Sequence, residues 1–163
     1  IPRYQMPEAV VQSSIRPLVA SDNGALTAIY ATTAGPSLDF LMRLYQQPTT
    51  RAWIQESAGA TLGAAWFSVF DASAELIDLS ISPAHRRQGW GMKLLQSSLD
   101  VLASESVSIC HLEVRRSNSA AIALYQRTNF QIVGERANYY RGKDGREDAI
   151  LMRRESSGCG ECL

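Results

Sequence analysis

The chain has 163 residues, of which 45% are hydrophobic, and its 16 basic and 16 acidic side chains leave no formal net charge. This length buries one good core and is short for two, so we expect one domain over residues 1–154, followed by a disordered tail over residues 155–163. The balanced charge argues against a nucleic-acid or anionic membrane partner, so an anionic ligand would have to be met by a small local site.

Neither apolar runs nor cysteines indicate a membrane or secreted protein. The longest apolar runs are much shorter than the roughly 20 residues of a membrane-spanning helix, and no signal peptide opens the chain, which predicts a cytoplasmic protein. Cys159 and Cys162 form a CxxC in the tail, but a closed zinc site usually takes four ligands. His85 and His111 lack partners at metal-ligand spacing, so we expect no metal.

The first half of the chain predicts a strand, two helices and then an antiparallel meander. The strand ends near Val19, and the helix that follows is capped by Ser21 or Asp22. A second short helix begins after Pro36 and ends before Pro48. Three strand candidates with tight turns between them then cover residues 49–57, 60–70 and 73–82. Their alternating aromatic side chains are expected in the core, with one as a candidate to line a substrate pocket: Trp53, Trp66, Phe67 and Phe70.

The second half predicts a crossover that places two strands in parallel. A helix follows two glycines and ends near Ser104, and a buried strand covers residues 107–114. Strand, helix and strand in this order are typical of a right-handed crossover with parallel strands. A helix over residues 118–128 and strands over 130–136 and 147–153 complete the chain. The predicted fold class is α/β, with a mixed, mostly antiparallel sheet of six to seven strands flanked by about four helices.

The stretch "HRRQGWGMKLL" places Gly89 and Gly91 where the third helix begins, directly behind Arg86 and Arg87. The first N–H groups of a helix have no partner within it, and residues without side chains let a phosphate approach them. A tight turn in which the glycines only relieve strain is the alternative. The stretch matches neither the GxxxxGKS of nucleotide triphosphatases nor the GxGxxG of dinucleotide folds.

Two motifs resemble a known family. Arg86-x-x-Gly89-x-Gly91 resembles the acyl-CoA pyrophosphate motif of the GNAT N-acetyltransferase superfamily, and the order of elements matches the GNAT fold. "LEVRRSNSAAIALYQRTNF", followed by "YY" and "EDAILM", is similar to the RimI-type ribosomal-protein alanine N-acetyltransferases. The resemblance is strong over residues 76–152 and implies acetyl-CoA as the co-substrate. The residues that it assigns to acetyl-CoA are Leu79, Ser80, Ile81, Arg86, Arg87, Gln88, Gly89, Trp90, Gly91, Met92 and Asn118.

Glu113 and Tyr125 are the candidate catalytic residues. Glu113 shares a strand face with His111 and Arg115, and a carboxylate in a buried strand is costly unless it is paired or functional. A salt bridge and a general base are therefore both open, and the resemblance implies the base. Taken alone, Asn118 caps the next helix and Tyr125 is a half-buried core residue. The resemblance implies that Asn118 binds the pantetheine arm, that Tyr125 protonates the leaving thiolate, and that the backbone of residues 79–81 polarises the acetyl carbonyl.

The sequence departs from the family at two places. Asn129 replaces the usual glycine, but Asn also tolerates the left-handed conformation of a helix end. Residues 25–47 lack the aromatic "FPW" segment that contacts the acceptor in the ribosomal-protein enzymes. The missing segment leaves the identity of the acceptor open. The resemblance implies a primary amine, for which we expect a protein N-terminal α-amine first and a small-molecule amine or polyamine second. We expect a monomer or dimer. The alternative that is not an enzyme is a non-catalytic acyl-CoA-binding module. The presence of both Glu113 and Tyr125 argues against it.

Overall fold

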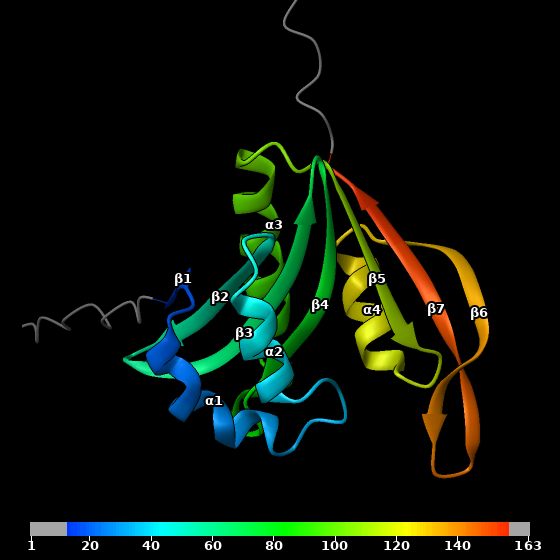
Figure 1. The fold of residues 1–163 in the computed structure, drawn as a ribbon, viewed down its shortest axis with the longest axis horizontal. Coiled ribbons are helices and arrows are strands. Elements are labelled where there is room, and N and C mark those ends of the chain that lie inside the picture. Colours follow the sequence, from blue (N-terminus) through cyan, green and yellow to red (C-terminus); the bar gives the residue numbers. More distant parts are fainter. Residues whose placement is uncertain (1–12, 157–163) are drawn as a thin grey trace, which may run out of the picture.

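The computed structural model describes residues 13–156, within which seven strands form one mixed sheet in the order β1-β2-β3-β4-β5-β7-β6 (Figure 1). The strands are β1 Ser13–Pro17, β2 Thr50–Ser57, β3 Ala60–Phe70, β4 Ser73–Ile81, β5 Ile109–Arg115, β6 Gln131–Gly142 and β7 Gly145–Glu155. Neighbouring strands run antiparallel except β4 and β5, which are parallel, as the crossover pattern predicts.

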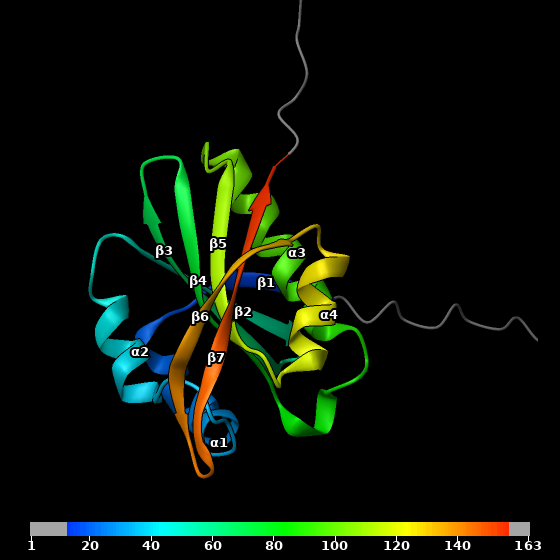
Figure 2. The same ribbon diagram turned by 90° about the vertical axis from the view of Figure 1, so that its right-hand side faces the viewer.

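Four α-helices of the described part of the chain cover the two faces of this sheet (Figure 2). They are α1 Asn23–Tyr30, α2 Leu38–Tyr45, α3 Trp90–Ser104 and α4 Ser119–Arg127, and two short 3-10 turns are η1 Ala20–Asp22 and η2 Pro83–His85. Helices α1 and α2 lie on one face, and α3 and α4 lie on the other. The predicted fold class is confirmed. None of these helices is both long enough and apolar enough to cross a bilayer.

Each face of the sheet has its own hydrophobic core. Under α3 and α4, Leu95 and Leu112 pack with Phe67, and under α1 and α2, Leu26 and Leu41 pack with other fully buried side chains. Each such side chain stabilises the fold by about 1.5–3 kcal/mol through burial. The core prediction holds for Trp53, Trp66 and Phe67 and is wrong for Phe70, which is 76% exposed beyond the helices at the end of β3.

A β-bulge separates β4 from β5. The consecutive β3 residues Trp66 and Phe67 pair with Asp78 and Leu76, so Ile77 is an extra residue in β4. A bulge bends its strand and increases the local twist. Accordingly, β4 pairs with β5 only over its first three residues, after which the two strands separate (Figure 1).

The last two strands are longer than the sequence predicts. Their pairing shifts in register after Arg136, resumes at Tyr140 and continues to a tight turn after Gly142. This part of the hairpin is polar, so hydrophobic alternation does not mark it as strand. Asn129 has φ +68°, the left-handed conformation that was predicted for it. The tail cysteines, Cys159 and Cys162, lie outside the described residues, while β7 runs to Glu155.

Candidate active site

The turn between η2 and α3 ends in a helix N-terminus that is open. Gly89 is the N-cap of α3, with φ +83°, and a Cβ on it would meet no atom within 4 Å. The first bond of the helix runs from the Lys93 N–H to the Gly89 carbonyl at 3.1 Å. The N–H groups of Trp90, Gly91 and Met92 therefore have no acceptor within the helix. Together with the positive end of the helix dipole, these groups suit a phosphate.

The side chains around this turn connect it to β4. Arg86, Arg87 and Gln88 are exposed, and the Arg86 Nε donates to the Ile81 carbonyl at 3.0 Å. A Cβ on Gly91 would lie 3.8 Å from Ile81 Cγ1 and 3.5 Å from a side chain of α4, so Gly91 is packed where Gly89 is open. The two glycines of the motif therefore differ in their surroundings: Gly89 lies at the open end of the helix, and Gly91 lies in ordinary contact with β4 and α4.

The end of β4 offers backbone groups to the space that β5 leaves. Leu79, Ser80 and Ile81 pair with β3 on one side, and β5 has separated on the other. Because backbone groups of a strand point alternately toward its two neighbours, part of the N–H and C=O groups of these residues face the gap. A Cβ on Gly63 of β3 would lie 2.4 Å from the Ser80 carbonyl, so a glycine is required where the two strands approach.

Glu113 of β5 lies beside the gap, on the sheet face that carries α1 and α2. Leu112 and Val114 are buried in the opposite core, so the predicted alternation is confirmed. The Glu113 Oε1 lies 3.4 Å from the Arg136 Nη1 of β6, and the two side chains are 24% and 53% exposed. An ion pair with this exposure is worth about 0–1 kcal/mol, so another cation can displace the guanidinium at little cost.

Tyr125 belongs to α4, and its side chain lies on the opposite face of the sheet, where α3 and α4 pack. Its ring contacts Phe130, with the ring centroids 5.8 Å apart, and packs against the α3 core. Burial raises the pKa of Tyr125, and the negative charge of Asp78 raises it further, so the phenol is protonated at neutral pH. Leu79 and Ile81, at the end of β4 beside the gap, pack against the same core as Tyr125.

Asn118 caps α4, as the sequence predicts. Its side-chain Oδ1 accepts a hydrogen bond from the Ala121 N–H at 3.2 Å. The residue is exposed at the start of the helix. Its contact with pantetheine stays a prediction.

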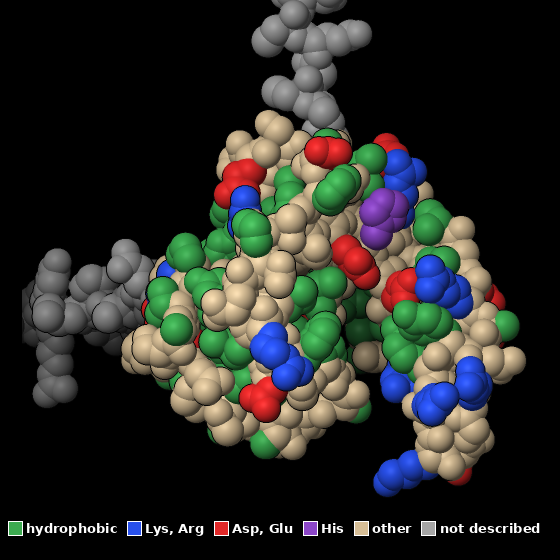
Figure 3. Space-filling model, in the orientation of Figure 1, with side chains coloured by type: hydrophobic (Ala, Val, Ile, Leu, Met, Phe, Trp, Pro, Cys, Tyr) green, Lys and Arg blue, Asp and Glu red, His purple; other side chains and the backbone are tan. Residues whose placement is uncertain are grey.

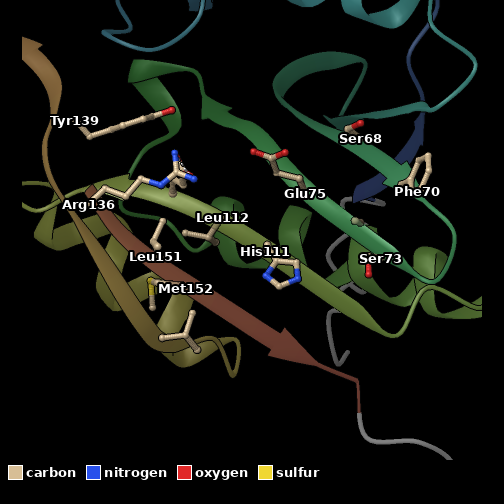
Figure 4. Close-up of a pocket in the computed structure, with 13 residues that line it drawn as sticks. Ser68, Phe70, Ser73, Glu75, His111, Leu112, Arg136, Tyr139, Leu151 and Met152 are labelled. Atoms are coloured by element: carbon tan, nitrogen blue, oxygen red, sulfur yellow. Dashed lines mark ion pairs between the residues drawn. The ribbon is translucent and has the colours of Figure 1, made fainter. Parts of the chain in front are cut away.

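A groove of about 650 Å³ extends from Glu113 along the sheet. Figure 3 shows it as a hollow between the body of the protein and the β6–β7 hairpin. Glu75 of β4 and His111 of β5 lie in its floor, Phe70 of β3 lines one side, and Tyr139 of β6 lines the other (Figure 4). The groove therefore reaches the predicted base from the face opposite Tyr125.

Asp78 is a site residue that the sequence interpretation missed. Its Oδ2 accepts hydrogen bonds from the Tyr30 hydroxyl at 2.7 Å and the Ser80 hydroxyl at 2.8 Å. The Trp66 Nε1 in turn donates to the Tyr30 oxygen at 2.8 Å. Burial raises the pKa of Asp78, while the two hydroxyls oppose this rise. This network ties the end of α1 to β4 at the gap.

The arginines that follow Glu113 are held by the hairpin. Arg115 Nη1 lies 3.6 Å from the Glu147 carboxylate, and its guanidinium lies 4.4 Å from the centroid of the Tyr140 ring. Arg116 Nη2 lies 2.5 Å from the Glu135 carboxylate. Both side chains thus fix the hairpin beside the groove.

Within residues 13–156, no three His, Cys, Asp or Glu side chains are grouped as metal ligands would be.

A family model decides the relationship that the motifs suggest. The model described as "Acetyltransferase (GNAT) family" matches residues 19–130, which include the open turn, Glu113 and Tyr125. The chain belongs to the GNAT family. The GNAT resemblance stated from the sequence is therefore confirmed, and the seven-stranded sheet with its gap between β4 and β5 is the fold of a GNAT protein.

Two comparisons connect this GNAT chain to RimI-type proteins. It is 47% identical over 79 residues to the [ribosomal protein bS18]-alanine N-acetyltransferase of Escherichia coli. These 79 residues make up 48% of this chain and 53% of that protein. The sequence match thus spans about half the length of this curated relative. The crystal structure of the ribosomal-protein-S18-alanine N-acetyltransferase from Escherichia coli has a TM-score of 0.84 at 34% identity, covering 93% of this chain and 99% of that chain.

The fold is also shared with an acetyltransferase that is named for another acceptor, spermidine. A chimeric spermidine N-acetyltransferase of Vibrio cholerae has a TM-score of 0.78 at 21% identity, covering 88% of this chain and 95% of that chain. At this identity the likeness concerns the fold alone. A shared fold does not assign the acceptor of this chain.

Proposed function

We propose that this GNAT chain is an acetyl-CoA-dependent N-acetyltransferase whose acceptor is the N-terminal α-amine of a protein. The arrangement at the gap between β4 and β5 carries the acetyl transfer, and the likeness to the alanine N-acetyltransferase of Escherichia coli supports a protein α-amine as the acceptor. Glu113 approaches from the face of the groove, Tyr125 lies on the other face, and the open N-terminus of α3 is tied to the end of β4. A base, an acid and a phosphate site thus surround one opening.

The residues around α3 fit acetyl-CoA. The open Gly89 turn leaves the first N–H groups of the helix accessible to a pyrophosphate, and Arg86 and Arg87 add positive charge there. When bound, acetyl-CoA supplies an acetyl group activated as a thioester. The residues that would hold it are the predicted set of Leu79, Ser80, Ile81, Arg86, Arg87, Gln88, Gly89, Trp90, Gly91, Met92 and Asn118.

Glu113 acts as the general base in this proposal. The ammonium of the acceptor displaces the weakly paired guanidinium of Arg136 from Glu113. The Glu113 carboxylate then takes a proton from this ammonium. A positioned base contributes about 10²–10⁴-fold to a rate. The sequence allows Glu113 either a salt bridge or the role of base, and both can hold. The ion pair with Arg136 is partly exposed, so the guanidinium can leave when the acceptor binds.

Tyr125 acts as the general acid. Its raised pKa keeps a proton on the hydroxyl, which this group delivers to the departing sulfur. Backbone N–H groups of Leu79 to Ile81 that face the gap orient and polarise the carbonyl of the acetyl group. The three functions come from different elements that border the gap, and this gap opens where the bulge bends β4 away from β5.

An acceptor screen tests the proposal. Release of free thiol from acetyl-CoA is followed with three acceptors at equal concentration: a peptide with a free N-terminus, the same peptide blocked at its N-terminus but carrying lysine, and spermidine. We expect turnover with the first, and mass spectrometry should place the acetyl group on the α-amine.

Two outcomes would contradict this function in different ways. Turnover with spermidine alone would keep the acetyltransferase and replace the acceptor class by polyamines. Binding of acetyl-CoA without turnover on any of the three amines would instead favour a non-catalytic acyl-CoA-binding module. The Tyr125→Phe variant serves as the control for enzymatic thiol release, because spontaneous hydrolysis of the thioester is independent of it.

A further inference from the structure

We propose that the groove binds the residues that follow the acceptor's α-amine, and that Glu75 selects a basic side chain at the third residue of the acceptor. This inference rests on the proposed function, because it takes the α-amine to lie at Glu113. It goes beyond that function by naming the class of polypeptide that the site prefers and the residue that reads it.

The position of the groove makes it a continuation of the reaction site. Its floor is the paired part of β4 and β5, where Glu75 and His111 are register partners. Glu113 lies two residues further along β5, at the edge of the gap. A chain that enters along this floor therefore meets Glu113 just where the sheet opens toward the other face.

Exposed apolar side chains gather around this groove. Phe70 is 76% exposed, Val133 58% and Tyr139 46%, and all three line it. They account for half of the large exposed hydrophobic residues in the described part of the chain, where the other three are Val19, Phe40 and Ile132. Apolar side chains concentrated around a hollow with polar floor residues are typical of a binding site.

The charge of the floor favours a cationic partner. Glu113 is paired with Arg136, whereas Glu75 is exposed and makes neither an ion pair nor a side-chain hydrogen bond within residues 13–156. Figure 4 shows Glu75 beside His111, between Arg136 and Tyr139 on one side and Ser68 and Phe70 on the other. A carboxylate left unpaired in a groove with apolar walls is complementary to a lysine or arginine side chain.

The spacing along the strands identifies the position. An extended chain rises about 3.3 Å per residue, and its side chains return to the same face every second residue. Glu113 and His111 are two residues apart on β5, and Glu75 lies across from His111. With the α-amine of the first acceptor residue at Glu113, the third residue lies over Glu75 and projects toward it.

The experiment uses hexapeptides with a free N-terminus that differ only at the third residue, which is lysine, alanine or glutamate. For the wild-type protein we expect the lysine peptide to have the lowest KM, by about two- to fivefold, as for a partly exposed ion pair, with kcat unchanged. Glu75→Gln should remove this preference, and Glu75→Lys should transfer it to the glutamate peptide. The advantage should shrink in 0.5 M salt.

Binding is also measured without turnover, as the fluorescence anisotropy of the same peptides labelled at the C-terminus in the presence of CoA. Asp100→Asn is the matched control, because Asp100 is an exposed carboxylate on α3, on the other face of the sheet. It should leave all three peptides unchanged. Moving the lysine to the second residue should abolish its advantage.

The failure of this inference can be told from that of the proposed function. Equal KM and equal anisotropy for the three peptides, all of them acetylated, would overturn the role of Glu75 and leave the N-acetyltransferase intact. Acetylation of spermidine with no binding of any peptide would overturn both. A lysine preference that persists in Glu75→Gln would assign the selection to another residue and so also refute the inference.

Discussion

Glu113 and Tyr125 approach the gap between β4 and β5 from opposite faces of the sheet. Glu113 lines the open groove, whereas Tyr125 is packed against the core under α3 and α4. An amine that arrives from the groove and a thiolate that leaves toward α3 would thus each meet their own proton carrier. Two proton transfers separated by a sheet should be separable by mutation.

Replacing the base should affect turnover and spare the co-substrate. We expect Glu113→Gln to lower kcat by about 10²–10⁴-fold, with the Kd for acetyl-CoA unchanged, because the residue faces the groove and not α3. The deficit should shrink as the pH rises above about 8, where α-amines lose their proton unaided. Rates of acetyl transfer between pH 6.5 and 9 test this, with Asp100→Asn as control. A deficit that is constant over this range would instead indicate a structural role.

Replacing the acid should leave the fold and binding intact. Tyr125→Phe keeps the ring contact with Phe130, so the melting temperature should change little while kcat falls. Because burial raises the pKa of Tyr125 above its usual value of about 10, the wild-type rate should show no loss from this group below pH 10. Stopped-flow thiol release and a thermal melt are the measurements. An unchanged kcat would remove Tyr125 from the mechanism.

The phosphate site can be tested with two glycines in the same conformation. Gly89→Val places a side chain at the open N-terminus of α3, which should block approach to the N–H groups and abolish binding of CoA. It also strains a backbone with φ +83°. Gly59 in the β2–β3 turn has φ +78° and equally open surroundings. Gly59→Val should therefore destabilise the protein similarly while CoA still binds in calorimetry. Equal loss of binding in both would show that strain, not access, is responsible.

Much of this arrangement could be predicted from the sequence. The glycine turn, the buried strand with Glu113 and the cap at Asn118 each have a local pattern, because the periodicity of strands and helices determines which face a residue takes. For Phe70 the alternation wrongly predicts a core position, because alternation marks a face of the strand but does not tell where the covering helices end.

Other features depend on contacts that local patterns do not contain. The extra residue at Ile77 breaks the alternation of β4, and the partner of Asp78 is Tyr30, which lies 48 residues away. Arg136 meets Glu113 only through the register of the hairpin with β7 and of β7 with β5. One signal is present in the sequence: a carboxylate in an apolar strand needs a partner or a function, and Asp78 is such a carboxylate as much as Glu113 is.

The Asp78 network predicts how the stability depends on pH. Burial raises the pKa of Asp78 above the ordinary value of about 3.9, so the ionised form is less favourable in the folded protein than in the unfolded chain. Its contribution to stability is therefore full below the ordinary value and is lost as the pH rises through the raised one. Asp78→Asn keeps an oxygen that accepts from Tyr30 and Ser80 without the charge. We expect it to raise the melting temperature at pH 8, by about 2–4 °C for each kcal/mol of relief, with the gain disappearing toward pH 4. Thermal melts between pH 4 and pH 8 test this expectation. For the control Asp100→Asn, the difference in melting temperature from the wild type should not vary with pH. A variant that is least stable at pH 8 would show instead that the two hydroxyls require the charged carboxylate.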